Sequence, residues 1–442
     1  WLAAQPVAPV ADTTSLDGRR LLVTQITAEG FADTTSLPGL PLASEAMLDR
    51  VLMRYALPFT VAVCEGDLRG LTPGHDRRQS MRLQETARTI LGLGQVEAAS
   101  YSYSLPTTWS GAAPISGALN ATAPKGKVGL EREIAGSLAF IHQQLLGSGR
   151  TMSLMSWPQG TVPSPAAVAF SQKMGVENVE TISQQILPGR IPAPAARSWG
   201  VGENFQTLMV QTRHGKALDA AAFIAEAQRT GQQRWLSPVQ ASLSFQDAAS
   251  ETSLKQVERL LNWCASQPLQ AITAGQYAGL SRDAASTRIF QTGPARWIIV
   301  NKGQARTLRL PVSAGVPDLA RCTGVAGYVQ QGDQLYIHTL GLRRTELVMR
   351  SEPVREHLRL TSASASIRYL ESGINRALLQ VSHSRPVEFV FAGIAPGSIC
   401  QMIANGKPDY LMADTAGRIE FIVPGQATVQ LSILANHKSA MR

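Results

Sequence analysis

Apolar and polar residues alternate through the first two thirds of the chain in a way that predicts strands and helices in turn. Continuous apolar runs predict strands at 19–28, 59–64 and 96–101, and apolar residues at helical spacing predict helices at 44–54 and 76–92. The alternation continues with expected elements at 131–146 (helix), 152–157 (strand), 164–174 (helix) and 269–273 (strand). Such alternation implies parallel strands joined by crossover helices, hence an α/β barrel or a doubly wound sheet.

The pattern changes near residue 286. From Thr287 onward short β-like runs recur, separated by turn signals such as Gln331-Gly332-Asp333. Regularly spaced short strands are typical of an antiparallel sandwich. We therefore expect an α/β domain over 18–286 and a β-sandwich domain over 287–442.

Composition and charge narrow the class of protein. The 442 residues are 44% hydrophobic and 17% charged, which describes a folded protein of two or three domains. The net charge of +9 is a mild excess of 41 basic over 32 acidic residues, without a basic cluster interleaved with aromatic residues. We therefore expect no nucleic-acid partner. No apolar run reaches about 18 residues, so we expect no membrane span.

The N-terminal segment and the cysteines add two expectations. The chain begins at Trp1 and continues through a Pro/Ala-rich stretch, and we interpret residues 1–17 as a linker or the end of an upstream region. The cysteines show no CxxC or CxxH spacing, which argues against a zinc finger; they are Cys64, Cys264, Cys322 and Cys400. Pairing of Cys322 with Cys400 and four free thiols both stay open.

Several stretches occur in the order found in a known family. They include Leu37-Pro38-Gly39, residues 55–61, Glu65-Gly66, residues 96–100, residues 133–137 and residues 324–328. On these residues the chain, over roughly 15–340, resembles the deacetylase domain and the following domain of the Pel polysaccharide deacetylase/hydrolase family, periplasmic proteins of bacterial biofilm-matrix production. The resemblance implies a (β/α)7-type polysaccharide-deacetylase barrel and a periplasmic or extracytoplasmic location. It also implies an acetylhexosamine-type exopolysaccharide, or exopolysaccharide-synthesis proteins, as partners.

The chain departs from this family where the chemistry should be. Family members carry two aspartates, spaced i and i+2, on the loop after the first strand: one is a general base and the other a metal ligand. The resemblance places Thr27 and Glu29 there, and a threonine hydroxyl takes no proton near neutral pH. Two family histidines, spaced i and i+4, correspond to Tyr101 and Leu105, and a late-strand histidine corresponds to Ser244. A catalytic zinc needs about three protein ligands, so we expect no metal, and zinc only if the site has been rebuilt.

Aromatic residues are the remaining candidates for binding. If the barrel closes as in the family, its cleft would be lined by Phe31, Tyr101, Tyr103, Trp109, Trp157 and Trp199. Aromatic faces stack on the C–H faces of sugars, although Trp157 could equally pack the mouth of the barrel. Tyr101 and Tyr103 alternate along an extended segment, so they cannot both face the cleft.

These observations favour a catalytically inactive, polysaccharide-deacetylase-like protein that binds glycan or serves as a scaffold in exopolysaccharide assembly. The alternative is an active polysaccharide deacetylase or hydrolase with a non-standard site, or a fragment of a larger bifunctional enzyme. Glu29 is the one carboxylate that could remain as a base at the expected site.

Overall fold

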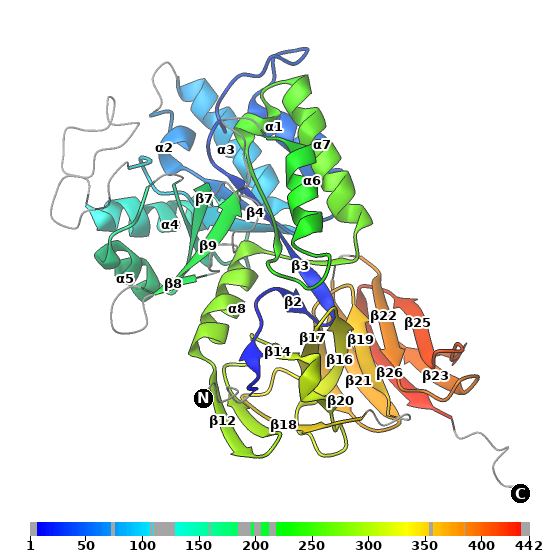
Figure 1. Cartoon of the computed structure of the whole chain (residues 1–442). Helices are drawn as coiled ribbons and strands as arrows, with labels where there is room; N and C mark the ends of the chain where they lie inside the picture. The colour runs from blue at the N-terminus through cyan, green and yellow to red at the C-terminus, as the bar shows by residue number, and fades with distance from the viewer. Residues whose placement is uncertain are drawn as a thin grey trace, which may run out of the picture.

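The structure is a computed structural model that describes residues 7–71, 76–106, 109, 129–158, 161–183, 196–198, 205–211, 218–352, 357–383 and 385–434. An α/β part with its helices occupies one end of the molecule, and a β-rich part occupies the other (Figure 1).

The α/β part is built on a mostly parallel sheet in which β3 (Arg19–Thr27) is buried along its whole length and pairs with four other strands, β2, β4, β10 and β11. The strands run in the order β10-β3-β4-β5-β6-β7-β9-β8, with β11 and β2 also paired to β3. Their bounds are β2 (Ser15–Leu16), β4 (Phe59–Val63), β5 (Val96–Ser100), β6 (Leu154–Trp157), β7 (Glu177–Ser183), β8 (Ala196–Ser198), β9 (Phe205–Gln211), β10 (Val239–Ser244) and β11 (Leu269–Ile272). Strand β9 also contacts β10, so the sheet curls back toward its first edge.

Helices join these strands in the alternation that the sequence predicts. They are α1 (Ala43–Met47), α2 (Glu65–Leu68), α3 (Arg77–Gly92), α4 (Ser137–Phe140), α5 (Pro165–Lys173), α6 (Ala220–Arg229), α7 (Glu251–Ser266) and α8 (Ala274–Ser286). Short π-helical turns η1 (Leu48–Leu52), η2 (Glu131–Gly136) and η3 (Ile141–Leu145) extend α1 and flank α4, and the 3₁₀ turn η4 (Phe245–Ala248) follows β10. Side-chain caps fix several starts: Asp76 accepts from the backbone N–H of Gln79, and Asp219 accepts from those of Ala221 and Ala222.

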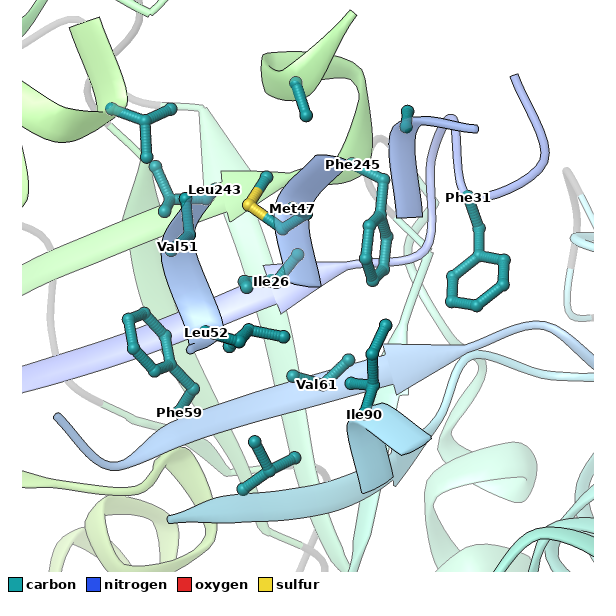
Figure 2. Close-up of a cluster of buried hydrophobic side chains, with 14 of the residues drawn as sticks. Ile26, Phe31, Met47, Val51, Leu52, Phe59, Val61, Ile90, Leu243 and Phe245 are labelled. Carbon is teal, nitrogen blue, oxygen red and sulfur yellow. The ribbon is translucent and has the colours of Figure 1, made fainter. Parts of the chain in front are cut away.

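The predicted elements of the α/β part are confirmed to within a few residues. The strand expected at 19–28 is β3, and the helices expected at 44–54 and 76–92 are α1 with η1, and α3. Ile26 and Val61 from neighbouring strands pack with Leu52 and Phe59 into one buried apolar cluster, and Leu243 of β10 completes it (Figure 2). The helices thus cover the sheet with the residues whose spacing predicted them.

The β-rich part contains three sheets within the described residues. A seven-stranded sheet has the order β1-β14-β17-β16-β19-β22-β25, a four-stranded sheet β12-β13-β18-β15, and a five-stranded sheet β20-β21-β26-β23-β24. The first comprises β1 (Val10–Ala11), β14 (Thr307–Pro311), β16 (Val325–Gln331), β17 (Gln334–Thr339), β19 (Arg359–Ala363), β22 (Val387–Ala392) and β25 (Arg418–Val423). The other two comprise β12 (Arg288–Gly293), β13 (Arg296–Val300), β15 (Val316–Pro317), β18 (Arg344–Arg350), β20 (Ile367–Ser372), β21 (Arg376–Ser382), β23 (Ile399–Ala404), β24 (Lys407–Met412) and β26 (Gln426–Ile433); the 3₁₀ turn η5 (Val312–Ala314) follows β14.

Two apolar clusters divide this β-rich part more finely than the single sandwich that the sequence predicts. Trp297, Leu308 and Leu347 belong to one cluster, whereas Leu379 and Phe389 belong to another. The seven-stranded sheet supplies residues to both, so it runs through the whole β-rich part and packs against a different small sheet at each end.

Residues assigned to a linker by the sequence also have structure. Val10–Ala11 forms β1, which pairs antiparallel with β14, and Ser15–Leu16 forms β2, which pairs with β3. The chain therefore joins the β-rich part before it enters the α/β sheet. All four cysteines are free thiols, and Cys322 and Cys400 lie in different apolar clusters. No helix in the described part of the chain is long and apolar enough to cross a membrane.

Candidate functional site

The positions singled out by the sequence gather at the carboxyl ends of the parallel strands. Thr27 ends β3, Ser244 ends β10 directly beside it in register, and Tyr101 follows β5. In α/β sheets this edge is where ligands bind, because successive loops converge there. The structure thus brings together the positions that the resemblance identifies.

Glu29 and Tyr101 form the closest polar contact of the site. The hydroxyl of the fully buried Tyr101 donates a hydrogen bond to Oε1 of Glu29. Within the described residues, Oε2 of Glu29 is buried and has no hydrogen-bond partner. The residues at two expected metal-ligand positions are therefore bonded to each other.

The other three positions offer no further ligand in this geometry. The hydroxyl of Thr27 donates to the carbonyl of Leu243 at 3.2 Å. Ser244 caps η4, since its backbone N–H and its hydroxyl both approach Oδ2 of Asp247, at 2.8 and 3.3 Å. Leu105 is half-buried and has no lone pair. In the described part of the chain no three His, Cys, Asp or Glu side chains are grouped to hold a metal ion, and this donor set does not fit zinc.

A buried polar cluster inside the sheet ties three strands together below the site. Gln25 of β3 donates through Nε2 to the hydroxyl of Ser242 on β10 at 2.8 Å and to that of Thr181 on β7. All three side chains are buried. Because β7 is far from β3 in the strand order, the Gln25–Thr181 bond spans the curled sheet and helps to hold its shape.

The backbone after β5 is unusual directly after Tyr101 and at Leu105, the two positions where the family has its histidines. Ser102 and Leu105 have positive φ angles, 82° and 53°, although neither is glycine. Glu133 holds this segment: its carboxylate accepts from the backbone N–H groups of Tyr103 and Ser104, both at 3.0 Å, and from the Ser104 hydroxyl. Burial raises the pKa of Glu133, and these hydrogen bonds oppose that rise.

Within the described residues, the candidate aromatic rings are buried and pack against other side chains instead of being exposed to solvent. Phe31 is 1% exposed and packs edge-on against Phe245 with ring centres 4.7 Å apart. Trp109 and Trp157 are 2% and 0% exposed and pack edge-on against each other, also at 4.7 Å. Their indole N–H groups donate within the protein, from Trp109 to the Thr161 hydroxyl at 3.3 Å and from Trp157 to Asn178 Oδ1 at 3.1 Å.

Tyr103 is likewise buried, and the guanidinium of Arg132 covers its ring at 3.8 Å. The hydroxyl of Tyr101 donates a hydrogen bond to Glu29, and Trp199 lies outside the described residues. Every candidate ring in the described part of the chain is therefore buried and has a partner within the protein, an arrangement that was weighed from the sequence only for Trp157.

Two site-building carboxylates, Glu65 and Glu133, were not recognised as such from the sequence. Both are fully buried. Glu65 directly follows Cys64, just after the end of β4, and Glu133 lies in η2, just before α4. They stand in stretches that carry the family resemblance, Glu65-Gly66 and residues 133–137. A glutamate within an otherwise apolar or small-residue stretch was the available signal, since a charge there requires internal partners.

Comparison with known proteins gives no family assignment. No family model and no curated protein matches this sequence. Among solved structures, the chain is similar to a GH57-type branching enzyme from the archaeon Pyrococcus horikoshii, with 8% identity, 59% of this chain and 70% of that chain covered, and a TM-score of 0.38. It is also similar to a GH30 endoxylanase from Clostridium papyrosolvens C71, with 9% identity, 97% and 100% covered, and a TM-score of 0.30. At these TM-scores the similarities support no conclusion on fold or function.

Proposed function

We propose that this protein is a catalytically silent relative of the polysaccharide deacetylases, acting outside the cytoplasm as a glycan-binding or scaffolding component of exopolysaccharide assembly. The observation that carries the proposal is the Tyr101–Glu29 hydrogen bond. It joins two positions at which the resemblance implies metal ligands, and the hydroxyl of Thr27 donates a hydrogen bond to a carbonyl and takes no proton near neutral pH.

The strand order supports a deacetylase-type scaffold. Seven strands, β10-β3-β4-β5-β6-β7-β9, are parallel throughout, and β9 returns to contact β10. The positive φ angles of Ser102 and Leu105 support it as well, because strained backbone of this kind is concentrated at functional sites. These features are what we expect of a deacetylase-type framework whose ligating residues have been replaced.

The burial of the aromatic rings bears on how such a component would work. Since five of the six candidate rings are buried and engaged internally, stacking on a sugar through them would require repacking of the site. Scaffolding is therefore favoured over a stacking groove at this edge of the sheet.

The test compares the native protein with a variant in which the family residues are restored together: Thr27→Asp, Glu29→Asp, Tyr101→His and Leu105→His. Both are incubated with zinc and desalted, and zinc per chain is measured. Deacetylation of an acetylhexosamine oligomer is then measured. We expect well under one zinc per chain and no acetate release for the native protein, and about one zinc per chain for the restored variant.

One observation favours the active-enzyme alternative, namely the unpartnered Oε2 of Glu29 in the described structure. About one zinc per native chain that disappears in Glu29→Ala, or acetate release that depends on Glu29, would overturn the silent assignment. The matched control is Glu346→Ala, which removes a half-buried carboxylate of β18 that, among the described residues, pairs with the exposed Arg296 and Arg344.

A further inference from the structure

A cavity lies close to the segment after β5, since the backbone N–H of Glu65 in its wall donates to the carbonyl of Ser102. It has a volume of about 570 Å³ and lies between α2, α3 and the helical segment formed by η2, α4 and η3. This volume is in the range of small-molecule sites. Its polar wall is made by Glu65, Arg69, Arg132, Gln84, Gln143 and Gln144.

A buried carboxylate fixes two guanidinium groups in this wall. Glu65 is 0% exposed and accepts from both terminal nitrogens of Arg132, at 2.7 and 2.8 Å, and from Nε of Arg69 at 2.6 Å. The Arg132 contact is the bidentate fork that orients a guanidinium most firmly. The single negative charge of Glu65 is thus shared by Arg69 and Arg132, and these three residues together carry one excess positive charge.

Aromatic rings hold both guanidinium groups from one face. Arg132 lies over Tyr103 at 3.8 Å and Arg69 lies over Phe140 at 4.5 Å. Their side chains nevertheless stay 38% and 48% exposed. In the part of the chain that the structure describes, the two terminal nitrogens of Arg69 make no hydrogen bond. Donors with fixed geometry therefore remain available at the cavity.

Neighbouring groups add positive charge and neutral hydrogen-bonding groups. Arg88 donates to the carbonyl of Gln144 at 2.8 Å and approaches Oε1 of Gln84 at 3.5 Å. Gln143 and Gln144 are exposed. The adjacent carboxylate of Glu133 also interacts with the charge of Arg132, but it does not line the cavity, and its oxygens accept from Tyr103 and Ser104. An anion is thus favoured, and the amide side chains provide donors and acceptors for hydroxyl groups.

We propose that this cavity binds a saccharide that carries a carboxylate, with the carboxylate on Arg69 and Arg132 and the sugar hydroxyls on the glutamine side chains. Glu65 is a positioning residue that pre-orients the two guanidinium groups. The inference does not rest on the proposed function, since none of these residues occupies a metal or base position.

The test is a titration of the full chain with D-glucuronate, followed by saturation-transfer difference NMR at constant ionic strength. D-glucose and acetate are titrated separately as controls: glucose is a neutral sugar without a carboxylate, and acetate is a carboxylate without a sugar. We expect saturable binding of glucuronate, at least tenfold tighter than that of glucose or acetate. Arg69→Gln, which leaves the Glu65–Arg132 fork in place, should weaken it roughly tenfold or more, the usual effect of losing a charge-assisted hydrogen bond.

The matched control is Arg376→Gln, which removes the same charge from an exposed position in the β-rich part and should leave the affinity unchanged. Absence of saturable binding, or equal glucuronate affinity in Arg69→Gln and in the native protein, would overturn the site. Acetate or glucose binding as tightly as glucuronate would overturn the ligand class. The zinc measurements above have no bearing on these outcomes, so failure of either proposal leaves the other distinguishable.

Discussion

Asp283 provides the sharpest test of how the α/β part is joined to the β-rich part. It lies near the end of α8, is 2% exposed, and its carboxylate accepts three backbone N–H groups from the loop between β13 and β14. Oδ1 accepts from Lys302 at 2.7 Å, and Oδ2 accepts from Gln304 at 2.7 Å and Ala305 at 2.9 Å. The residue thereby fixes the β13–β14 loop of the β-rich part to α8, the last helix of the α/β part.

The substitution Asp283→Asn keeps the shape of the side chain but places an NH2 group opposite at least one N–H donor. One charge-assisted hydrogen bond is then lost, at about 2 kcal/mol, and two are weakened from charged to neutral, at about 0.5–1 kcal/mol each. We expect the free energy of unfolding to fall by about 3 kcal/mol. Asp283→Ala removes all three bonds and should lower it further.

The measurement is urea unfolding followed by far-UV circular dichroism and tryptophan fluorescence. Asp333→Asn is the matched control, since Asp333 is exposed in the turn between β16 and β17 and should change stability by less than about 0.5 kcal/mol. If Asp283→Asn unfolded at the same urea concentration as this control, the three hydrogen bonds would not hold the junction and the reasoning would be refuted.

Three further perturbations probe other parts of the structure. Leu243→Ala empties a fully buried position in the cluster of Figure 2 and should lower the free energy of urea unfolding by about 2–5 kcal/mol. Gly18→Ala should destabilise far more than Gly39→Ala in the same assay: both glycines have φ near 80°, but a Cβ at Gly18 would lie 1.9 Å from the carbonyl oxygen of Thr361, whereas nothing lies within 4 Å at Gly39. Burial lowers the pKa of His338 to about 3, so between pH 6.5 and about 3 only the unfolded state gains this proton. Stability should then fall as pH falls, by up to about 1.4 kcal/mol per pH unit, and His338→Leu should remove that part of the slope in urea titrations at several pH values.

The α/β elements could be predicted because their apolar residues are placed by local geometry. The run at 19–28 contains alternating and adjacent apolar residues that only a strand buried on both faces accommodates, and it forms β3. The helix expected at 76–92 starts at an aspartate cap and presents Leu83, Ala87 and Ile90 to the sheet. Such patterns depend only on residues close together in the sequence, so they can be recognised without knowledge of the tertiary structure.

The division of the β-rich part could not be predicted in the same way. Strands of both apolar clusters show similar alternation, so the sequence does not reveal that Leu308 and Phe389 belong to different packing layers. Likewise, nothing in the sequence of Val10–Ala11 indicates its pairing with β14, a partner almost 300 residues away. Strand partners depend on long-range packing, which a local pattern does not encode.

The candidate site shows the same limit in chemical terms. The sequence identified its positions through resemblance, but it did not reveal which aromatic rings are buried against other side chains. Trp109 and Trp157 find internal partners for both their ring faces and their N–H groups, because a buried indole needs such a partner. Residue type alone therefore did not separate binding from packing.

The hydrogen-bond partners of four carboxylates show what distinguishes a structural role from a chemical one. Glu133 and Asp283 use their lone pairs on backbone N–H groups of this chain, and Glu65 uses its own on two arginines. Acceptors so engaged are held in place and have little capacity left for a substrate. Glu29 differs, since one oxygen is bonded to a tyrosine hydroxyl and the other has no partner among the described residues. Among the five positions that the resemblance identifies, Glu29 is therefore the one with a carboxylate oxygen that has no described partner, and for this reason the Glu29→Ala comparison tests the silent scaffold against the altered enzyme.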